Sequence, residues 1–362
     1  MKLSETLIVI KQLNASFQTR EGLVQAVDGA SLELKRGQIF GLIGETGSGK
    51  SVLGLSLVRL LPAQASVSGS ILYKGKDLLK LSPKEMRQIR GREIALIPQN
   101  PASSLNPVMT LGSQLREAIR AYAGRAGNKQ LNSQAAGLLH AMNMPDAEQQ
   151  LRRYPFQLSG GMKQRVLAAM GLAGSPSMLI ADEPTKGLDA LIRVQVTEML
   201  ANMARRTGAA LLLITHDLDA ARVLCDEVGV MYAGQIIEQG PAKELFAQPM
   251  HPYTRGLIAS MPSRGMIPIA GTAPSLTDMP AGCKFYERCS FAMLRCKAEQ
   301  PDLYKAAHTD ITNKAVDQVG GMAEGQQAAA QHTAILHTTT TAPYKTAPHT
   351  TVPHKVRCFL YA

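Results

Sequence analysis

Short apolar runs recur along the first two thirds of the chain, and several of them end directly at glycine or at a polar side chain. Residues 38–43, 94–98, 178–181 and 211–214 show this pattern. Continuous apolar runs of this length are typical of strands that are buried on both faces of a parallel sheet. The pattern therefore predicts an α/β fold in which polar residues gather where these strands end.

The stretch between the apolar runs at 94–98 and 178–181 has a helical rather than a strand-like pattern. Residues 102–157 carry few strand signals, and their pattern predicts helices at 111–123 and 134–144. We therefore expect a helical subdomain at about residues 100–170, inserted into a nucleotide-binding domain of residues 1–250. Residues 251–362 are expected to form a C-terminal extension.

The most specific motif is the segment 44–51, which has the spacing G-x-x-x-x-G-K-S between a predicted strand at 38–43 and a predicted helix at 52–61. Glycines let backbone N–H groups curl around an anion, and the start of the following helix adds partial positive charge. Lys50 can reach the β- and γ-phosphates of a nucleotide, and the Ser51 hydroxyl can bind Mg²⁺. The segment predicts a nucleotide-phosphate site made of Gly44, Glu45, Thr46, Gly47, Ser48, Gly49, Lys50, Ser51 and Val52.

Polar residues with suitable chemistry follow the other apolar runs. Asp182 suits Mg²⁺ through its water shell, and Glu183 suits a general base for water. Gln99 can touch Mg²⁺ or an attacking water, and His216 can contact a γ-phosphate. The candidate catalytic residues are Lys50, Gln99, Glu183 and His216, and the candidate magnesium ligands are Ser51, Gln99 and Asp182.

A second glycine-rich segment lies at 158–165, where Ser159 precedes the glycine pair Gly160 and Gly161. Ser159 can cap the helix that follows, which is the simplest interpretation of the pattern. The alternative is a second phosphate-binding helix terminus, because paired glycines allow close approach of backbone to an anion.

An aromatic residue, Phe17, lies in the polar stretch 16–22. In a loop, such a ring can stack on adenine. A buried anchor for the loop fits the spacing equally well.

Four of the five cysteines, namely Cys283, Cys289, Cys296 and Cys358, lie in the last 80 residues, whereas Cys225 stands alone as an expected packing residue. Four thiolates can hold a [4Fe–4S] cluster or a tetrahedral zinc ion. Zinc sites prefer cysteine pairs two to four residues apart, which are missing here, and free thiols remain a third interpretation. Between the third and fourth cysteines, residues 313–354 are rich in Thr, Ala, Gln and His and are predicted to be a flexible loop.

Charge and hydropathy narrow the choice of partners. The net charge of +11 is spread along the sequence rather than clustered, so nucleic acid is not an expected partner. No run of 18 apolar residues occurs, and the first residues lack the plan of a signal peptide. We expect a cytosolic protein.

Taken together and in this order, the motifs in residues 1–250 resemble those of the ATP-binding subunits of ABC transporters. The resemblance implies a P-loop NTPase (RecA-like) core with an antiparallel β subdomain and a helical subdomain. It assigns Walker A to 44–51, the Q-loop to Gln99, the signature LSGGMKQR to 158–165, Walker B and the catalytic glutamate to Asp182 and Glu183, the D-loop to 187–189 and the switch histidine to His216.

The segments 100–107, 251–255 and 280–289 resemble the oligopeptide, dipeptide and nickel uptake branch of that family. A mild departure is Lys186-Gly187, where the branch usually has small or Thr-Ala pairs. The spacing of the tail cysteines resembles that of the cluster-bearing members, which favours a structural [4Fe–4S] cluster.

The resemblance implies an ATP-hydrolysing subunit that powers an importer of peptides, nickel or a metal chelate across a bacterial inner membrane. Its implied partners are two membrane permease subunits, a second ATPase subunit of different sequence and, indirectly, an external solute-binding protein. Two ATPase subunits would sandwich two ATP molecules, so that Ser159 and Gly161 bind the γ-phosphate across the dimer. Gly160 and Asp189 are also expected to bind the nucleotide. The expected location is the cytoplasmic face of the membrane, with the protein bound peripherally.

Two other functions are alternatives to transport. A soluble ABC ATPase of nucleic-acid repair or translation usually carries two cassettes or a long coiled-coil insertion, and this chain has neither. A scaffold that does not hydrolyse ATP is opposed by the presence of Glu183 and His216.

Overall fold

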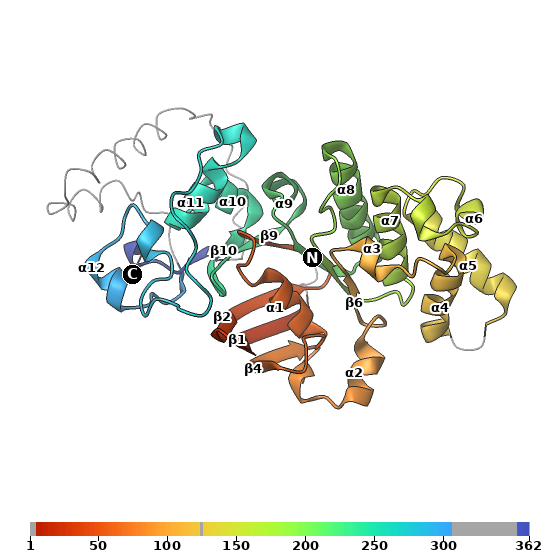
Figure 1. The fold of residues 1–362 in the computed structure, drawn as a ribbon, viewed down its shortest axis with the longest axis horizontal. Coiled ribbons are helices and arrows are strands. Elements are labelled where there is room, and N and C mark those ends of the chain that lie inside the picture. Colours follow the sequence, from red (N-terminus) through yellow and green to blue (C-terminus); the bar gives the residue numbers. More distant parts are fainter. Residues whose placement is uncertain (1–4, 124–125, 306–352, 362) are drawn as a thin grey trace.

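Two sheets, a helical arm and a C-terminal region make up the part of the chain that the computed structural model describes, which is residues 5–123, 126–305 and 353–361 (Figure 1). The expected flexible loop at 313–354 falls almost entirely outside these residues. Within them, no helix is both long and apolar enough to cross a bilayer.

The smaller sheet is antiparallel, with the strand order β2-β1-β4-β5. Its N-terminal hairpin is long, and β1 pairs with both β2 and β4 along most of its length. Phe17 lies within β1, opposite Val24 and Ala65, and not in a loop. The strands are β1 (Thr6–Thr19), β2 (Gly22–Lys35), β4 (Ala65–Tyr73) and β5 (Lys76–Asp77).

The larger sheet has the order β11-β12-β10-β9-β3-β8-β7-β6 among the described residues. Its central strands are parallel, as the apolar runs predict, and β9 and β10 form the closing antiparallel hairpin. The strands are β3 (Ile39–Ile43), β6 (Ile94–Ile97), β7 (Met178–Asp182), β8 (Ala210–Ile214), β9 (Glu227–Tyr232), β10 (Gln235–Pro241), β11 (Tyr304–Lys305) and β12 (Lys355–Val356).

The continuous apolar runs arise because the central strands have a hydrophobic core on each face. In β3, Ile39 and Ile43 enter the core on the helical-arm side, whereas Phe40 and Leu42 enter the core shared with the antiparallel sheet. Side chains alternate between the two faces of a strand, so both alternating sets must be apolar here.

Helices cover the larger sheet and form the arm. The arm, drawn at the right of Figure 1, contains α3 (Pro101–Ser104), α4 (Leu111–Ala123), α5 (Asn128–Ala141), α6 (Ala147–Gln150) and α7 (Gly160–Gly171). The other helices before the C-terminal region are α1 (Lys50–Leu57), α2 (Pro83–Ile89), α8 (Ala190–Thr207), α9 (Leu218–Leu224) and α10 (Ala242–Ala247). Short 3₁₀ helices are η1 (Leu78–Lys80) and η2 (Pro155–Gln157).

Two helices differ from the sequence prediction at their ends. The apolar pattern predicts a helix to residue 61, but α1 ends at Leu57 because Arg59 adopts a left-handed conformation with φ of 50°. The Arg59 guanidinium then donates to the carbonyl oxygens of Leu78 and Leu81, contacts that offset the strained backbone. The helix predicted at 134–144 begins earlier and ends earlier, at Asn128–Ala141.

The C-terminal region packs beside the larger sheet, at the left of Figure 1. It contains α11 (Pro252–Ala259), η3 (Pro262–Arg264), η4 (Tyr286–Arg288), α12 (Leu294–Ala298) and η5 (Phe359–Tyr361), together with β11 and β12. Through β12, which pairs antiparallel with β10, this region extends the sheet that carries the phosphate loop.

Candidate active site

The glycine-rich loop after β3 is held in a shape that only glycine can adopt at two positions. Gly44 has φ of 147° and Gly49 has φ of 102°, both in the region that L side chains avoid. A Cβ atom on Gly44 would lie 2.1 Å from the Met231 carbonyl oxygen, and one on Gly49 would lie 2.1 Å from the Ala26 carbonyl oxygen. The loop is therefore shaped by two β-strands that contact it, β9 and β2.

The Lys50 ammonium group lies inside this loop. Its Nζ donates to the carbonyl oxygens of Gly44 at 2.9 Å and Glu45 at 2.8 Å, and to Ser48 Oγ at 3.3 Å. Burial lowers the pKa of Lys50, and the carboxylates of Glu183 and Asp182 oppose that shift. A cation held in this way can exchange its loop partners for phosphate oxygens.

Ser51 and Asp182 form a pair of oxygen donors beside the loop. Ser51 Oγ donates to Asp182 Oδ1 at 2.9 Å, and burial raises the pKa of the Asp182 carboxyl group. Hydroxyl and carboxylate oxygens are the ligand types that Mg²⁺ takes at nucleotide sites. The residues present therefore fit a magnesium ion that would also bind phosphate.

Glu183 and His216 are in contact at the neighbouring strand ends. Glu183 Oε2 and His216 Nδ1 lie 2.5 Å apart, and the Glu183 N–H donates to the Ile214 carbonyl oxygen. Glu183 has φ of 45°, a left-handed conformation that a non-glycine residue adopts at a cost of about 1–3 kcal/mol. The backbone bond to β8 holds the carboxylate in this strained position beside the histidine.

Sheet topology explains why these residues converge. The strands β6, β7, β8 and β3 are consecutive and parallel, so their carboxyl ends share one edge of the sheet. Lys50 and Ser51 follow β3, Asp182 and Glu183 lie at the end of β7, and His216 follows β8. Gln99 lies two residues beyond β6, at the same edge and half-buried.

The segment with Ser159 and the two glycines lies elsewhere in the chain. Ser159 caps α7, accepting a hydrogen bond from the Met162 N–H at 3.4 Å. A Cβ on Gly161 would lie 2.5 Å from Ile192 Cγ2 in α8, and Asp189 caps α8 by accepting from the Ile192 N–H. The two motifs therefore pack against each other, whereas α1 packs against β1, β2, β7 and β8 (Figure 1).

The remaining candidate residues lie at positions that do not by themselves indicate a role in nucleotide binding. Phe17 is half-buried in β1, where a role in adenine binding stays a prediction. Thr46 and Gly47 are exposed at the tip of the loop, Ser48 is buried beneath it, and Val52 packs at the rim of the core below the antiparallel sheet.

Two residues that the sequence did not single out contact the loop directly. Arg288 from η4 forms a two-point ion pair with the Glu45 carboxylate, and the Tyr253 hydroxyl oxygen accepts from the Glu45 N–H. Both lie more than 200 positions from Glu45, so no local pattern could have predicted the contacts.

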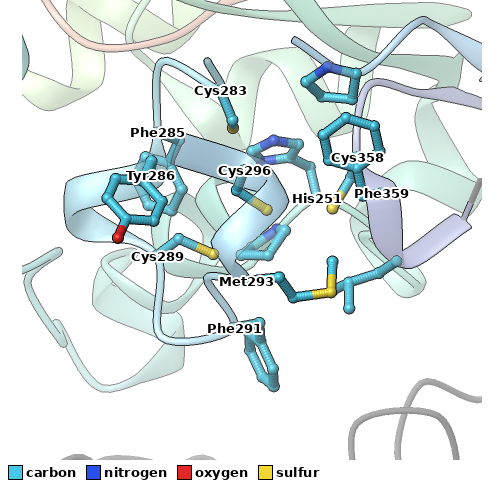
Figure 2. A pocket seen from close by; sticks show the side chains of 13 residues that line it. His251, Cys283, Phe285, Tyr286, Cys289, Phe291, Met293, Cys296, Cys358 and Phe359 are labelled. Carbon is cyan, nitrogen blue, oxygen red and sulfur yellow. The ribbon is translucent and has the colours of Figure 1, made fainter. Parts of the chain in front are cut away.

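The four tail cysteines line one pocket in the C-terminal region (Figure 2). Aromatic side chains of Phe285, Tyr286, Phe291 and Phe359 complete its wall. Burial raises the pKa of three of the thiols, that of Cys358 to about 12. In the described ranges, no three His, Cys, Asp or Glu side chains are placed to hold one metal ion.

Fold and site together define a P-loop nucleotide-hydrolysing cassette. A family scan matches residues 27–186 to a family described as ABC transporter, and residues 237–296 to the oligopeptide/dipeptide transporter, C-terminal region.

Curated relatives are similar over nearly all of their length. A probable peptide ABC transporter ATP-binding protein, y4tR of Sinorhizobium fredii, is 42% identical over 308 residues, which are 83% of this chain and 92% of the relative. The dipeptide transport ATP-binding protein DppD of Bacillus subtilis is 42% identical over 304 residues, which are 82% of this chain and 90% of the relative.

Solved structures share the fold. CbiO1 from Clostridium perfringens, part of the ABC transporter complex cbiONQ, has a TM-score of 0.58 at 28% identity, covering 67% of this chain and 92% of that one. The ATP-binding cassette MJ0796 in a dimeric, post-hydrolysis state has a TM-score of 0.59 at 23% identity, covering 66% of this chain and 99% of that one, which bears on the fold alone. The chain belongs to the ATP-binding proteins of ABC transporters, in the branch with the oligopeptide/dipeptide C-terminal region.

Proposed function

We propose that this protein hydrolyses ATP to power a membrane importer of peptides or dipeptides. The observation that carries the proposal is the convergence of Lys50, Ser51, Asp182, Glu183 and His216 at one edge of the parallel sheet. The branch, and relatives that are named for peptide and dipeptide transport, support the solute class. Neither relative is named for nickel, and nickel is not part of the proposal.

Each residue at the sheet edge has a chemical role. Lys50 neutralises phosphate charge, and the oxygen atoms of Ser51 and Asp182, with Gln99, would hold Mg²⁺. Glu183 accepts a proton from the attacking water, and His216 orients the glutamate and contacts the γ-phosphate. A bound Mg²⁺ would add Lewis-acid stabilisation of the phosphate charge that develops.

The second phosphate-binding terminus, at Ser159 to Gly161, is proposed to serve a partner cassette. It packs on α8 and not on the loop of its own chain, so two cassettes that face each other would each complete the other's site. Asp189, which caps α8, lies at the same surface. We propose that the second cassette is a different chain, as the family resemblance implies.

The cassette is proposed to act at the cytoplasmic face of the membrane, bound to two permease subunits, with an external solute-binding protein that delivers the peptide. Residues 1–250 would be the nucleotide-binding domain and residues 251–362 its extension. Both statements rest on the family.

A single substitution tests the catalytic assignment. Glu183→Gln should lower ATP hydrolysis by roughly 10²–10⁴-fold in the transporter purified with its permeases, because the base for water is lost. MgATP binding should stay close to that of the wild type. The matched control is Glu198→Gln, an exposed residue of α8 that should hydrolyse ATP normally. Near-normal hydrolysis by Glu183→Gln would contradict the assignment.

We further propose that the cysteine pocket holds a [4Fe–4S] cluster. The support is its donor set, since four thiols line one cavity (Figure 2). Cys283 and Cys289 flank η4, Cys296 lies in α12, and Cys358 directly precedes η5. Each cysteine of such a cluster binds a different iron atom, so its sulfur atoms need not meet around one ion. The cluster would supply cross-links that join the segment 283–296 to residue 358.

A further inference from the structure

The Glu45 carboxylate, in the phosphate loop, is held by an arginine of the C-terminal region. Arg288 Nη1 lies 2.9 Å from Glu45 Oε2, and Arg288 Nη2 lies 3.0 Å from Glu45 Oε1. Two parallel N–H···O bonds of this kind fix both the distance and the plane of the carboxylate.

The guanidinium group itself has little freedom. Its Nε donates to the Ala270 carbonyl oxygen, and the group lies 5.7 Å from the ring centres of both Tyr232 and Phe285. The side chain is only 5% exposed, whereas that of Glu45 is 32% exposed. The arginine therefore acts as the fixed partner and the loop as the part that is held.

A second contact fixes the backbone of the same loop residue. The Glu45 N–H donates to the Tyr253 hydroxyl oxygen at 2.9 Å. Tyr253 is fully buried and packs against Tyr232 and Phe285, the same rings that border Arg288. Both the side chain and the backbone of Glu45 are thus positioned from outside the nucleotide-binding motifs.

Glu45 matters for ATP because of its charge and its carbonyl group. Its carbonyl oxygen accepts a hydrogen bond from Lys50 Nζ, so a shift of Glu45 shifts the cation that meets the phosphates. Its carboxylate would repel an anionic nucleotide in the adjacent loop unless a cation compensates it. Arg288 supplies that cation at a fixed position.

We propose that Arg288 is a positioning residue for nucleotide binding, which neutralises Glu45 and thereby lets the phosphate loop accept MgATP. The inference rests on the proposed function, since it concerns the same loop. Arg288 ends η4 and directly precedes Cys289 of the cysteine pocket, so the pocket and the loop are joined through one short segment.

The test is a titration of the purified full chain with MgATP by calorimetry. Arg288→Met should weaken binding about tenfold, since a hydrogen-bonded charge pair is broken and its carboxylate is left uncompensated. Arg288→Lys should recover part of the loss, because lysine restores the charge without the two-point geometry. The matched control is Arg264→Met, an exposed arginine of η3, which should bind MgATP like the wild type.

A second substitution, at Glu45, distinguishes charge compensation by Arg288 from a purely structural role, because the two roles predict opposite changes in MgATP affinity. Glu45→Gln removes the repelling charge and keeps an acceptor for Arg288, so it should bind MgATP at least as tightly as the wild type. The double variant Glu45→Gln/Arg288→Met should bind more tightly than Arg288→Met alone. In hydrolysis assays, Arg288→Met should raise the KM for ATP about tenfold and change kcat by less than about twofold.

Two results would overturn the inference alone. One is wild-type binding by Arg288→Met, and the other is equal weakening by Glu45→Gln and Arg288→Met with no recovery in the double variant. If Arg288→Met does not fold, Glu45→Gln and Arg288→Lys are compared with the wild type instead. Weaker MgATP binding by Glu45→Gln, or wild-type binding by Arg288→Lys, would then overturn the inference. A wild-type protein that binds no MgATP would instead overturn the proposed function, and this inference with it.

Discussion

The glycine at the start of α1 is constrained by a carbonyl oxygen of the antiparallel sheet. Gly49 has φ of 102°, and a Cβ added to it would lie only 2.1 Å from the Ala26 carbonyl oxygen. Such a contact cannot be relieved by a side-chain rotation, because the backbone fixes the position of a Cβ and the Ala26 oxygen is itself a backbone atom. The antiparallel sheet therefore takes part in shaping the phosphate loop.

Replacement of this glycine tests the constraint. Gly49→Ala should displace the loop from Ala26 and abolish measurable MgATP binding, while lowering the free energy of unfolding by more than the roughly 1–3 kcal/mol of a strained backbone alone. Calorimetric titration and thermal unfolding measure the two effects. Gly208→Ala is the control, since Gly208 has φ of 69° but open space around it, so that variant should keep MgATP binding.

Residue-scale prediction from sequence succeeded where chemistry and spacing are local. The spacing of 44–51 predicted the position of Lys50 inside the loop, and the strand-end rule predicted that Asp182 and Glu183 would lie beside it. Tyr253 and Arg288 could not be predicted, because their contacts with Glu45 join segments far apart in the sequence. Phe17 was wrongly placed in a loop, since strand pairing on both sides of β1 overrides the polar composition.

At the scale of elements, the start of α7 depends on close contact with α8. Gly161 is buried, and Ile192 lies where its side chain would begin. The cap at Ser159 can therefore hold its place only while this position stays small. The same glycine that suits an anion is also needed for helix packing.

A bulky substitution at this contact should affect hydrolysis more than binding. Gly161→Val overpacks the interface at a cost of about 1–3 kcal/mol and turns the first turn of α7 away from α8. ATP hydrolysis by the transporter should fall about tenfold or more, while MgATP binding by the isolated chain stays unchanged. Gly137→Val, at an exposed position of α5 with open space, is the matched control and should hydrolyse ATP normally. An equal loss of ATP hydrolysis in Gly161→Val and Gly137→Val would contradict this account.

The hydrophobic periodicity of the sequence predicted the existence and type of most helices and strands. It did not predict the residues at which all of them end. The helix α4 was predicted with its observed bounds, Leu111–Ala123, whereas α1 was predicted too long. Residues after Leu57 are apolar enough to continue a helix. These residues do not continue α1 because Arg59 makes tertiary contacts, which a single sequence does not reveal.

At the scale of the whole molecule, the C-terminal region is attached to the cassette at several points. The pair β10–β12 joins the sheet, Arg288 joins the phosphate loop, and buried His354 Nε2 lies 2.7 Å from Glu238 Oε1. Long-range pairings of this kind leave no local signal, so the sequence predicted a C-terminal extension but not its contacts with the cassette.

The contents of the cysteine pocket can be measured directly. Protein purified without oxygen should contain about four iron atoms and four acid-labile sulfides per chain, and Cys289→Ser should lose them. Cys225→Ala is the control, since Cys225 is buried away from the pocket and should not alter the iron content. Zinc in place of iron, or no metal at all, would contradict the cluster.

The addition of β12 to the outer side of β10 also has a consequence for biosynthesis. Strand β10 leaves the ribosome more than a hundred residues before β12, which takes several seconds at about 5–20 residues per second. During that interval the hydrogen-bonding groups along that side of β10 have no partner strand, and an open strand edge can pair with another nascent chain. That side of β10 therefore stays open to such pairing until Lys355 and Val356 emerge and pair with it.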